Sequence, residues 1–121
     1  MFQAALFDEQ LRLLKVLSFQ GTEREVVPDL SAVFREAVRI EADAILIAHN
    51  HPSGNAQPSR ADQQLTREFS QACEQLEITL LDHIVFANGE NYSFRAHGVF
   101  DPGFLDRSIL QGGKRRASPE R

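Results

Sequence analysis

Apolar side chains follow two kinds of pattern along the chain, short runs and helical stripes. Residues 2–7 form a short apolar run and residues 11–19 alternate imperfectly, which predicts two strands that pair with each other. The continuous apolar run at residues 44–48 predicts a third strand, covered on both faces. Residues 78–87 and 92–94 predict two more strands, separated by a turn.

Two other stretches place apolar residues three and four positions apart, which is the spacing of one helix face. The first follows Pro28 and Asp29, and the second follows a Ser-x-x-Asp start signal formed by Ser59 and Asp62. The apolar positions are Leu30, Val33, Phe34, Ala37, Val38 and Ala42 in the first helix, and Leu65, Phe69, Ala72, Cys73 and Leu76 in the second. The resulting order, β-β-α-β-α-β-β, predicts an α/β layered domain with a mixed central sheet flanked by helices.

The size of the chain and the fading of the apolar pattern predict one domain with a polar tail. The chain has 121 residues and is 42% hydrophobic, which suffices for one core. We assign residues 1–104 to the domain and expect residues 105–121, including the basic cluster Lys114–Arg116, to be a disordered and solvated tail.

Charge and cysteine content argue against several functional classes. The net charge of −4 argues against direct nucleic-acid binding by this domain on electrostatic grounds. The one cysteine, Cys73, cannot form an internal disulfide, and its place on an apolar stripe indicates a small buried residue rather than a nucleophile. Because the sequence has neither an apolar run of ~18 residues nor a signal-peptide pattern, we expect no membrane association and a cytoplasmic location.

Two histidines and an aspartate form the candidate chemical site. His49 and His51 lie two positions apart at the end of a predicted strand, so their side chains point the same way. Asp62 follows in the first turn of the next helix. Two imidazole nitrogens and one carboxylate oxygen are three protein ligands, and catalytic zinc sites use three while leaving a fourth position for a nucleophilic water. The sequence therefore predicts a metal centre at the carboxyl end of a strand, where open α/β sheets bind ligands.

Each of these residues also has a purely structural interpretation. A His-x-His pair alone is weak evidence for a metal. Ser59 and Asp62 can serve only to cap the helix. Pro52, Gly54 and Pro58 can serve only as turn-formers. What favours the metal is that two histidines and a carboxylate coincide at one strand-to-helix loop.

The hexapeptide His-Asn-His-Pro-Ser-Gly that begins at His49 resembles the JAMM metal motif of the MPN/JAB superfamily, and more closely its RadC-like family. The resemblance covers roughly residues 2–100. It implies a cytidine-deaminase-like α/β fold and a zinc-dependent hydrolase of the metallopeptidase or isopeptidase type. By position, His49, His51 and Asp62 would be the Zn²⁺ ligands. Ser59 would stabilise the oxyanion that forms when water attacks a carbonyl.

The chain departs from this family at the catalytic base. The superfamily uses an upstream Glu, expected immediately before the residue that matches Phe2, and here that position is Met1. Glu25, Glu36 and Glu41 are other acids, which we interpret as solvated surface residues. We therefore expect the 121-residue chain to bind Zn²⁺ yet to hydrolyse amide bonds very poorly.

Two functions besides hydrolysis stay open. The family name is associated with DNA repair, so the chain can be a non-catalytic, metal-binding interaction module of a DNA-repair or mobile-element-associated protein. It can also be a metal-free structural relative. His83, which the family also carries, has a role either in supporting the site or in packing, and we assign none to His97. The sequence does not identify a substrate or an oligomeric state.

A truncation after Phe104 tests the boundary between domain and tail. Because residues 105–121 lack apolar periodicity, their removal should leave the melting temperature unchanged. Thermal unfolding followed by circular dichroism measures this. A large drop would mean that the tail docks on the core.

Overall fold

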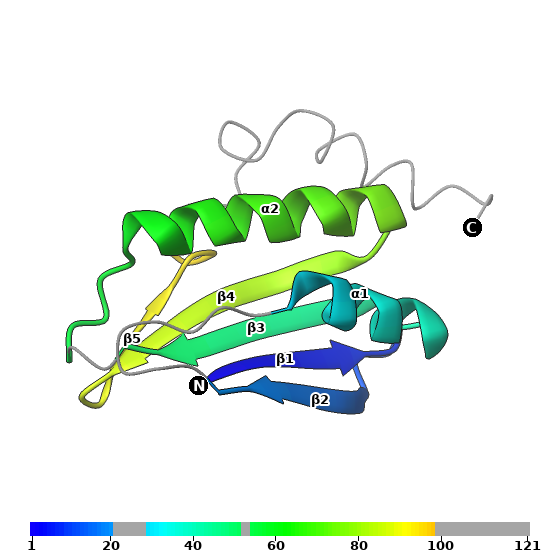
Figure 1. Cartoon of the computed structure of the whole chain (residues 1–121), viewed down its shortest axis with the longest axis horizontal. Helices are drawn as coiled ribbons and strands as arrows, with labels where there is room; N and C mark the ends of the chain where they lie inside the picture. Colours follow the sequence, from blue (N-terminus) through cyan, green and yellow to red (C-terminus); the bar gives the residue numbers. More distant parts are fainter. Residues whose placement is uncertain (21–28, 52–53, 99–121) are drawn as a thin grey trace.

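Five strands form a mixed sheet that carries two helices. The computed structural model describes residues 1–20, 29–51 and 54–98, which Figure 1 shows in colour. The sheet order is β2-β1-β3-β4-β5; β3 and β4 pair in parallel and the other neighbours pair antiparallel. The elements are β1 (Phe2–Phe7), β2 (Leu13–Phe19), α1 (Leu30–Arg39), β3 (Ala44–Asn50), α2 (Arg60–Leu76), β4 (Thr79–Ala87) and β5 (Glu90–Ser93). The predicted element order and the mixed sheet are confirmed.

Side-chain caps fix where both helices begin. The carboxylate of Asp29 accepts a hydrogen bond from the backbone N–H of Ala32 at 3.0 Å and starts α1. Helix α2 starts with a complete capping box, in which Ser59 Oγ accepts from the Asp62 N–H and the Asp62 carboxylate accepts from the Ser59 N–H. The predicted start signals are therefore real caps. Helix α2 ends at Glu77, whose left-handed backbone (φ 58°) closes the last turn.

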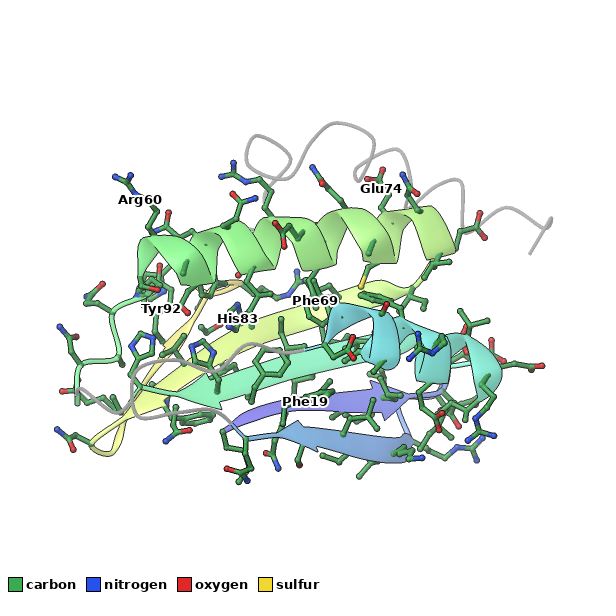
Figure 2. The ribbon with its side chains drawn as sticks, in the orientation of Figure 1. Phe19, Arg60, Phe69, Glu74, His83 and Tyr92 are labelled. Atoms are coloured by element: carbon green, nitrogen blue, oxygen red, sulfur yellow. The ribbon has the colours of Figure 1, made fainter. Side chains whose placement is uncertain are left out.

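One apolar core lies between the sheet and both helices. Phe69 of α2 contacts the rings of Phe2 in β1 and Phe34 in α1, with ring centroids 6.1 Å and 5.1 Å apart. Figure 2 shows Phe69 between α2 and the sheet. The buried cluster consists of Phe2, Ala4, Leu6, Val33, Ala37, Ala42, Ile45, Ile47, Phe69, Cys73, Ile78 and Leu80. Both helices thus pack on the same face of the sheet.

The burial of β3 differs from the sequence-based expectation in two respects. Ile45 and Ile47 are fully buried under the helices, whereas Leu46 and Ala48, on the opposite face, are only partly buried. Within the described residues, helices cover one face of this strand and not both. The strand also continues to Asn50, so His49 belongs to β3 and not to the loop after it.

Strand register places the end of β3 in the middle of the sheet. His49 lies opposite Phe2 of β1 on one side and opposite Val85 of β4 on the other. No helix among the described residues is long and apolar enough to cross a membrane. The predicted tail at residues 105–121 lies outside the described residues, and the domain boundary stays a prediction.

Replacement of Phe69 by alanine tests the core. Phe69 is fully buried, so Phe69→Ala should lower the free energy of unfolding by about 3–5 kcal/mol. Phe86→Ala is the control, because Phe86 of β4 is 46% exposed and its truncation should cost clearly less. Urea unfolding of both variants measures the difference. Equal losses would contradict the assignment of Phe69 to the core.

Candidate metal centre

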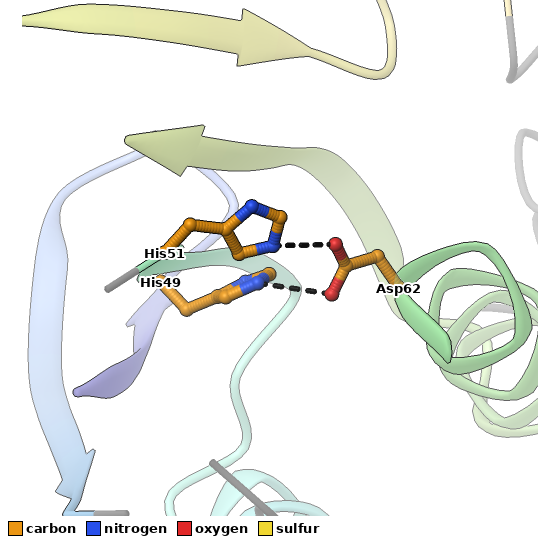
Figure 3. Close-up of side chains that lie close together, drawn as sticks. All are labelled: His49, His51 and Asp62. Atoms are coloured by element: carbon orange, nitrogen blue, oxygen red, sulfur yellow. Dashed lines mark hydrogen bonds and ion pairs between the residues drawn. The ribbon is translucent and has the colours of Figure 1, made fainter. Parts of the chain in front are cut away.

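The predicted metal ligands converge at the end of β3. Nε2 of His49 lies 3.0 Å from Asp62 Oδ1, and Nε2 of His51 lies 2.7 Å from Asp62 Oδ2. One ligand atom from each residue falls within 4.8 Å of the others. His49 and Asp62 are buried and His51 is partly buried. Figure 3 shows both imidazoles directed at the carboxylate.

The orientation of His51 comes from the loop that follows it. Its Nδ1 lies 2.8 Å from the backbone carbonyl of Asn55. Because a carbonyl oxygen only accepts hydrogen bonds, Nδ1 carries the proton and donates it. Nε2 is then the nitrogen that faces Asp62 and would bind a metal ion, as in a metal-ligating histidine held by a backbone carbonyl. The backbone N–H of His51 donates to the Phe86 carbonyl and ties the loop to β4.

Asp62 is ionised and ready to bind a cation. Burial raises the pKa of its carboxyl, but the close His49 imidazole and the backbone N–H of Ser59 outweigh burial and hold that pKa well below its usual range. A carboxylate oxygen that faces the lone pair of an imidazole nitrogen at 2.7 Å is electrostatically unfavourable unless a proton or a cation lies between them. Two such contacts meet at one carboxylate, so the donor set fits a divalent cation.

Comparison with known proteins agrees with this geometry. The model of the RadC-like JAB domain matches residues 1–99. The chain belongs to the RadC-like JAB family. It is also 45% identical over 96 residues to UPF0758 protein tlr1707 of Thermosynechococcus vestitus. That alignment covers 78% of this chain and 38% of the relative, so the chain spans well under half of the relative's length. Family membership confirms the α/β fold that the motif implied.

Ser59 lies beside the metal group as the N-cap of α2. Its backbone N–H donates to Asp62 Oδ2 at 2.8 Å, and its Oγ accepts from the Asp62 N–H at 3.0 Å. The side chain is exposed. A hydroxyl can accept and donate at once, so capping leaves its proton for a further acceptor. Pro52 and Ser53 of the RadC-like motif lie outside the described residues.

The other acids considered for the role of the base lie elsewhere. Glu36 of α1 bonds to Arg39 and Lys15, which lower its carboxyl pKa to about 2. Glu41 follows α1 and precedes the first residue of β3, so it lies at the opposite end of that strand from His49. Glu25 lies outside the described residues. Glu41 is an exposed surface acid, as interpreted from the sequence, whereas Glu36 is partly buried in its ion pairs with Lys15 and Arg39.

Strand alternation moves the expected position of the base by one residue. Phe2 points into the core beside His49, with ring centroids 6.1 Å apart. The carbonyl of Met1 accepts from the N–H of exposed Asn50, which continues the β1–β3 pairing. A side chain at position 1 therefore points away from the face that carries His49. In a chain extended at its N-terminus, the residue two positions before Phe2 would share that face.

Three further contacts support the metal group and are visible only in the folded chain. His83 Nε2 lies 3.1 Å from His49 Nδ1, Thr66 Oγ1 lies 2.5 Å from His83 Nδ1, and the Asn55 carbonyl holds His51. Sequence reasoning misses Thr66, although a hydroxyl beside the apolar stripe of α2, four residues after Asp62, is a usable signal. It also misses Asn55, because the contact is made by its backbone carbonyl, which every residue type has.

Cys73 is an inert thiol, as its place on the apolar stripe predicts. It belongs to α2 and its side chain is buried in the core, and this burial raises the pKa of its thiol to about 12. The thiolate, which is the nucleophilic form, is therefore scarce near neutral pH. Cys73 contributes to packing and not to the chemistry of the site.

Zinc titration tests the metal group. We expect the chain to bind one Zn²⁺, and His49→Ala or Asp62→Ala to weaken binding strongly because three ligands become two. His97→Ala is the control: His97 is exposed and stacks on Tyr92 at 4.0 Å. Competition with a chromophoric chelator measures the affinity. A folded wild-type chain that takes up no zinc would refute the site.

Proposed function

We infer that this RadC-like JAB domain is the hydrolytic domain of a zinc metallopeptidase or isopeptidase, with the ion held by His49, His51 and Asp62. The observation that carries this proposal is the convergence of two imidazole nitrogens and one buried carboxylate within 4.8 Å. A zinc ion in such a set supplies Lewis-acid activation of water near neutral pH. Three protein ligands leave one coordination position for that water.

The protein residues contribute orientation and charge. Asp62 holds its negative charge at the end of β3 while capping α2, so the strand and the helix are fixed relative to each other at the site. Ser59, in the turn that precedes Asp62, offers its O–H to the oxyanion of a carbonyl under attack. A base two positions before Phe2 would lie on the same sheet face as His49 and would take the proton of the attacking water.

One observation favours a second candidate, a metal-binding interaction module without catalysis. Among the described residues, neither Glu36 nor Glu41 lies at the metal group. The family name's association with DNA repair suggests the setting of such a module, while the net charge of −4 opposes a direct grip on DNA by this domain. The cytoplasmic location and a peptide or isopeptide substrate both stay expectations.

An N-terminal extension separates the two candidates. A Glu placed two positions before Phe2 should raise zinc-dependent hydrolysis of peptide or isopeptide bonds by roughly 10²–10⁴-fold, the usual contribution of a positioned base. Hydrolysis of fluorogenic peptides and isopeptide-linked conjugates, with and without a chelator, measures the rate. Ser59→Ala in the extended chain should lower it by roughly 10²–10³-fold through loss of the oxyanion donor.

Two matched controls make this test specific. The same extension with Gln in place of Glu should leave the rate low. Met1→Glu without an extension should also leave it low, because position 1 points to the other face of the sheet. Robust zinc-dependent hydrolysis by the 121-residue chain itself would support the hydrolase proposal but contradict a base two positions before Phe2. It would mean that another group supplies the base.

A further inference from the structure

A chain of hydrogen bonds runs behind the metal group, from the backbone of Asp62 to the ring of His49. The hydroxyl of Thr66 lies 2.8 Å from the Asp62 carbonyl and 2.5 Å from His83 Nδ1. His83 Nε2 lies 3.1 Å from His49 Nδ1. Thr66 and His83 are fully buried, so water does not compete for these bonds. Figure 2 shows His83 between α2 and the sheet.

The direction of these bonds follows from Thr66. Its hydroxyl has one proton, and the Asp62 carbonyl can only accept it. The hydroxyl oxygen must then accept from His83, so Nδ1 of His83 carries the proton of that ring. His83 is fully buried and its ring nitrogens bond to a hydroxyl and an imidazole rather than to a carboxylate, so the neutral ring is favoured over the charged one. Its Nε2 therefore has a lone pair, which accepts a hydrogen bond from the N–H of His49 Nδ1.

The result at His49 is the tautomer that a metal requires. With the proton on Nδ1, Nε2 would offer its lone pair to a bound ion, which Asp62 Oδ1, 3.0 Å away, would also bind. The reverse direction would place a proton on Nε2 of His49 and block it as a ligand. Since a ring that is fixed by a hydrogen bond at one nitrogen binds metal through the other, Thr66 and His83 decide which nitrogen of His49 faces the ion.

We propose that Thr66 and His83 are positioning residues, which form a relay that presents the lone pair of His49 Nε2 to the bound ion. Packing holds His83 in this role: its ring stacks on Phe94, with centroids 4.6 Å apart and planes 5° from parallel. The relay begins at the Asp62 carbonyl and ends opposite the Asp62 carboxylate. One residue therefore both binds the metal and orients its neighbouring ligand. The proposal rests on the metal site of the proposed function.

Zinc affinity of relay variants tests the proposal without any need for catalysis. Thr66→Val keeps the shape of the side chain but removes the hydroxyl, and it should weaken Zn²⁺ binding about 10–100-fold, the usual effect of losing such a partner. Thr66→Ser should retain most of the affinity, because it restores the hydroxyl. Ser70→Ala is the matched control: it removes a buried hydroxyl one turn further along α2, outside the relay, and should leave the affinity unchanged.

Histidine tautomers in the wild-type chain give a readout that does not depend on whether a variant folds. In long-range ¹H–¹⁵N spectra of the zinc-loaded chain, His83 should be neutral with its proton on Nδ1. A proton on Nε2 of His83, or wild-type affinity in folded Thr66→Val, would overturn the relay. A wild-type chain that binds no Zn²⁺ would instead overturn the metal site and the relay with it. Zinc binding that is strong in the wild type and equal in the variants leaves the metal site standing and removes only the relay.

Discussion

The contact between the Asp62 carboxylate and two imidazoles couples the first turn of α2 to the end of β3. Oδ2 accepts the capping bond from the Ser59 N–H and also lies 2.7 Å from His51 Nε2, while Oδ1 lies 3.0 Å from His49 Nε2. The same group thus starts a helix and completes a metal set. Because a helix cap has fixed geometry, α2 cannot slide along the sheet without opening the site. Helix capping and a metal-ligand role of Asp62, which the sequence offers as alternatives, are therefore compatible in this geometry.

The parts of this arrangement that could be predicted from sequence are those with local causes. The capping box depends on two residues three positions apart, and the paired histidines depend on strand alternation. The contact of Thr66 with His83 joins residues 17 positions apart and depends on how α2 lies on β4, which no local pattern specifies. For the same reason the apolar run of β3 does not reveal that both helices cover one face.

The alternation of side chains along β1 determines which positions before Phe2 face His49. The register that sets Phe2 opposite His49 also sets Met1 opposite the exposed Asn50. A shift of one residue moves every side chain of a strand to the other face. A base immediately before Phe2, as the family resemblance implies, would have its side chain on the sheet face opposite to that of His49. Under the proposed function, the pairing of β1 with β3 therefore favours a base two positions before Phe2.

Two polar residues, Thr66 and His83, are buried in the core behind the metal group. His83 and Thr66 are fully buried, and no buried side-chain nitrogen or oxygen among the described residues lacks a hydrogen-bond partner. Hydrogen bonds buried in this way add little net stability, and apolar groups of the same shape in both places can be nearly neutral. A purely structural account of the pair therefore explains little. Orientation of His49 explains both residues, because only a chain of donors and acceptors that reaches the metal ligand fixes which of its nitrogens carries the proton.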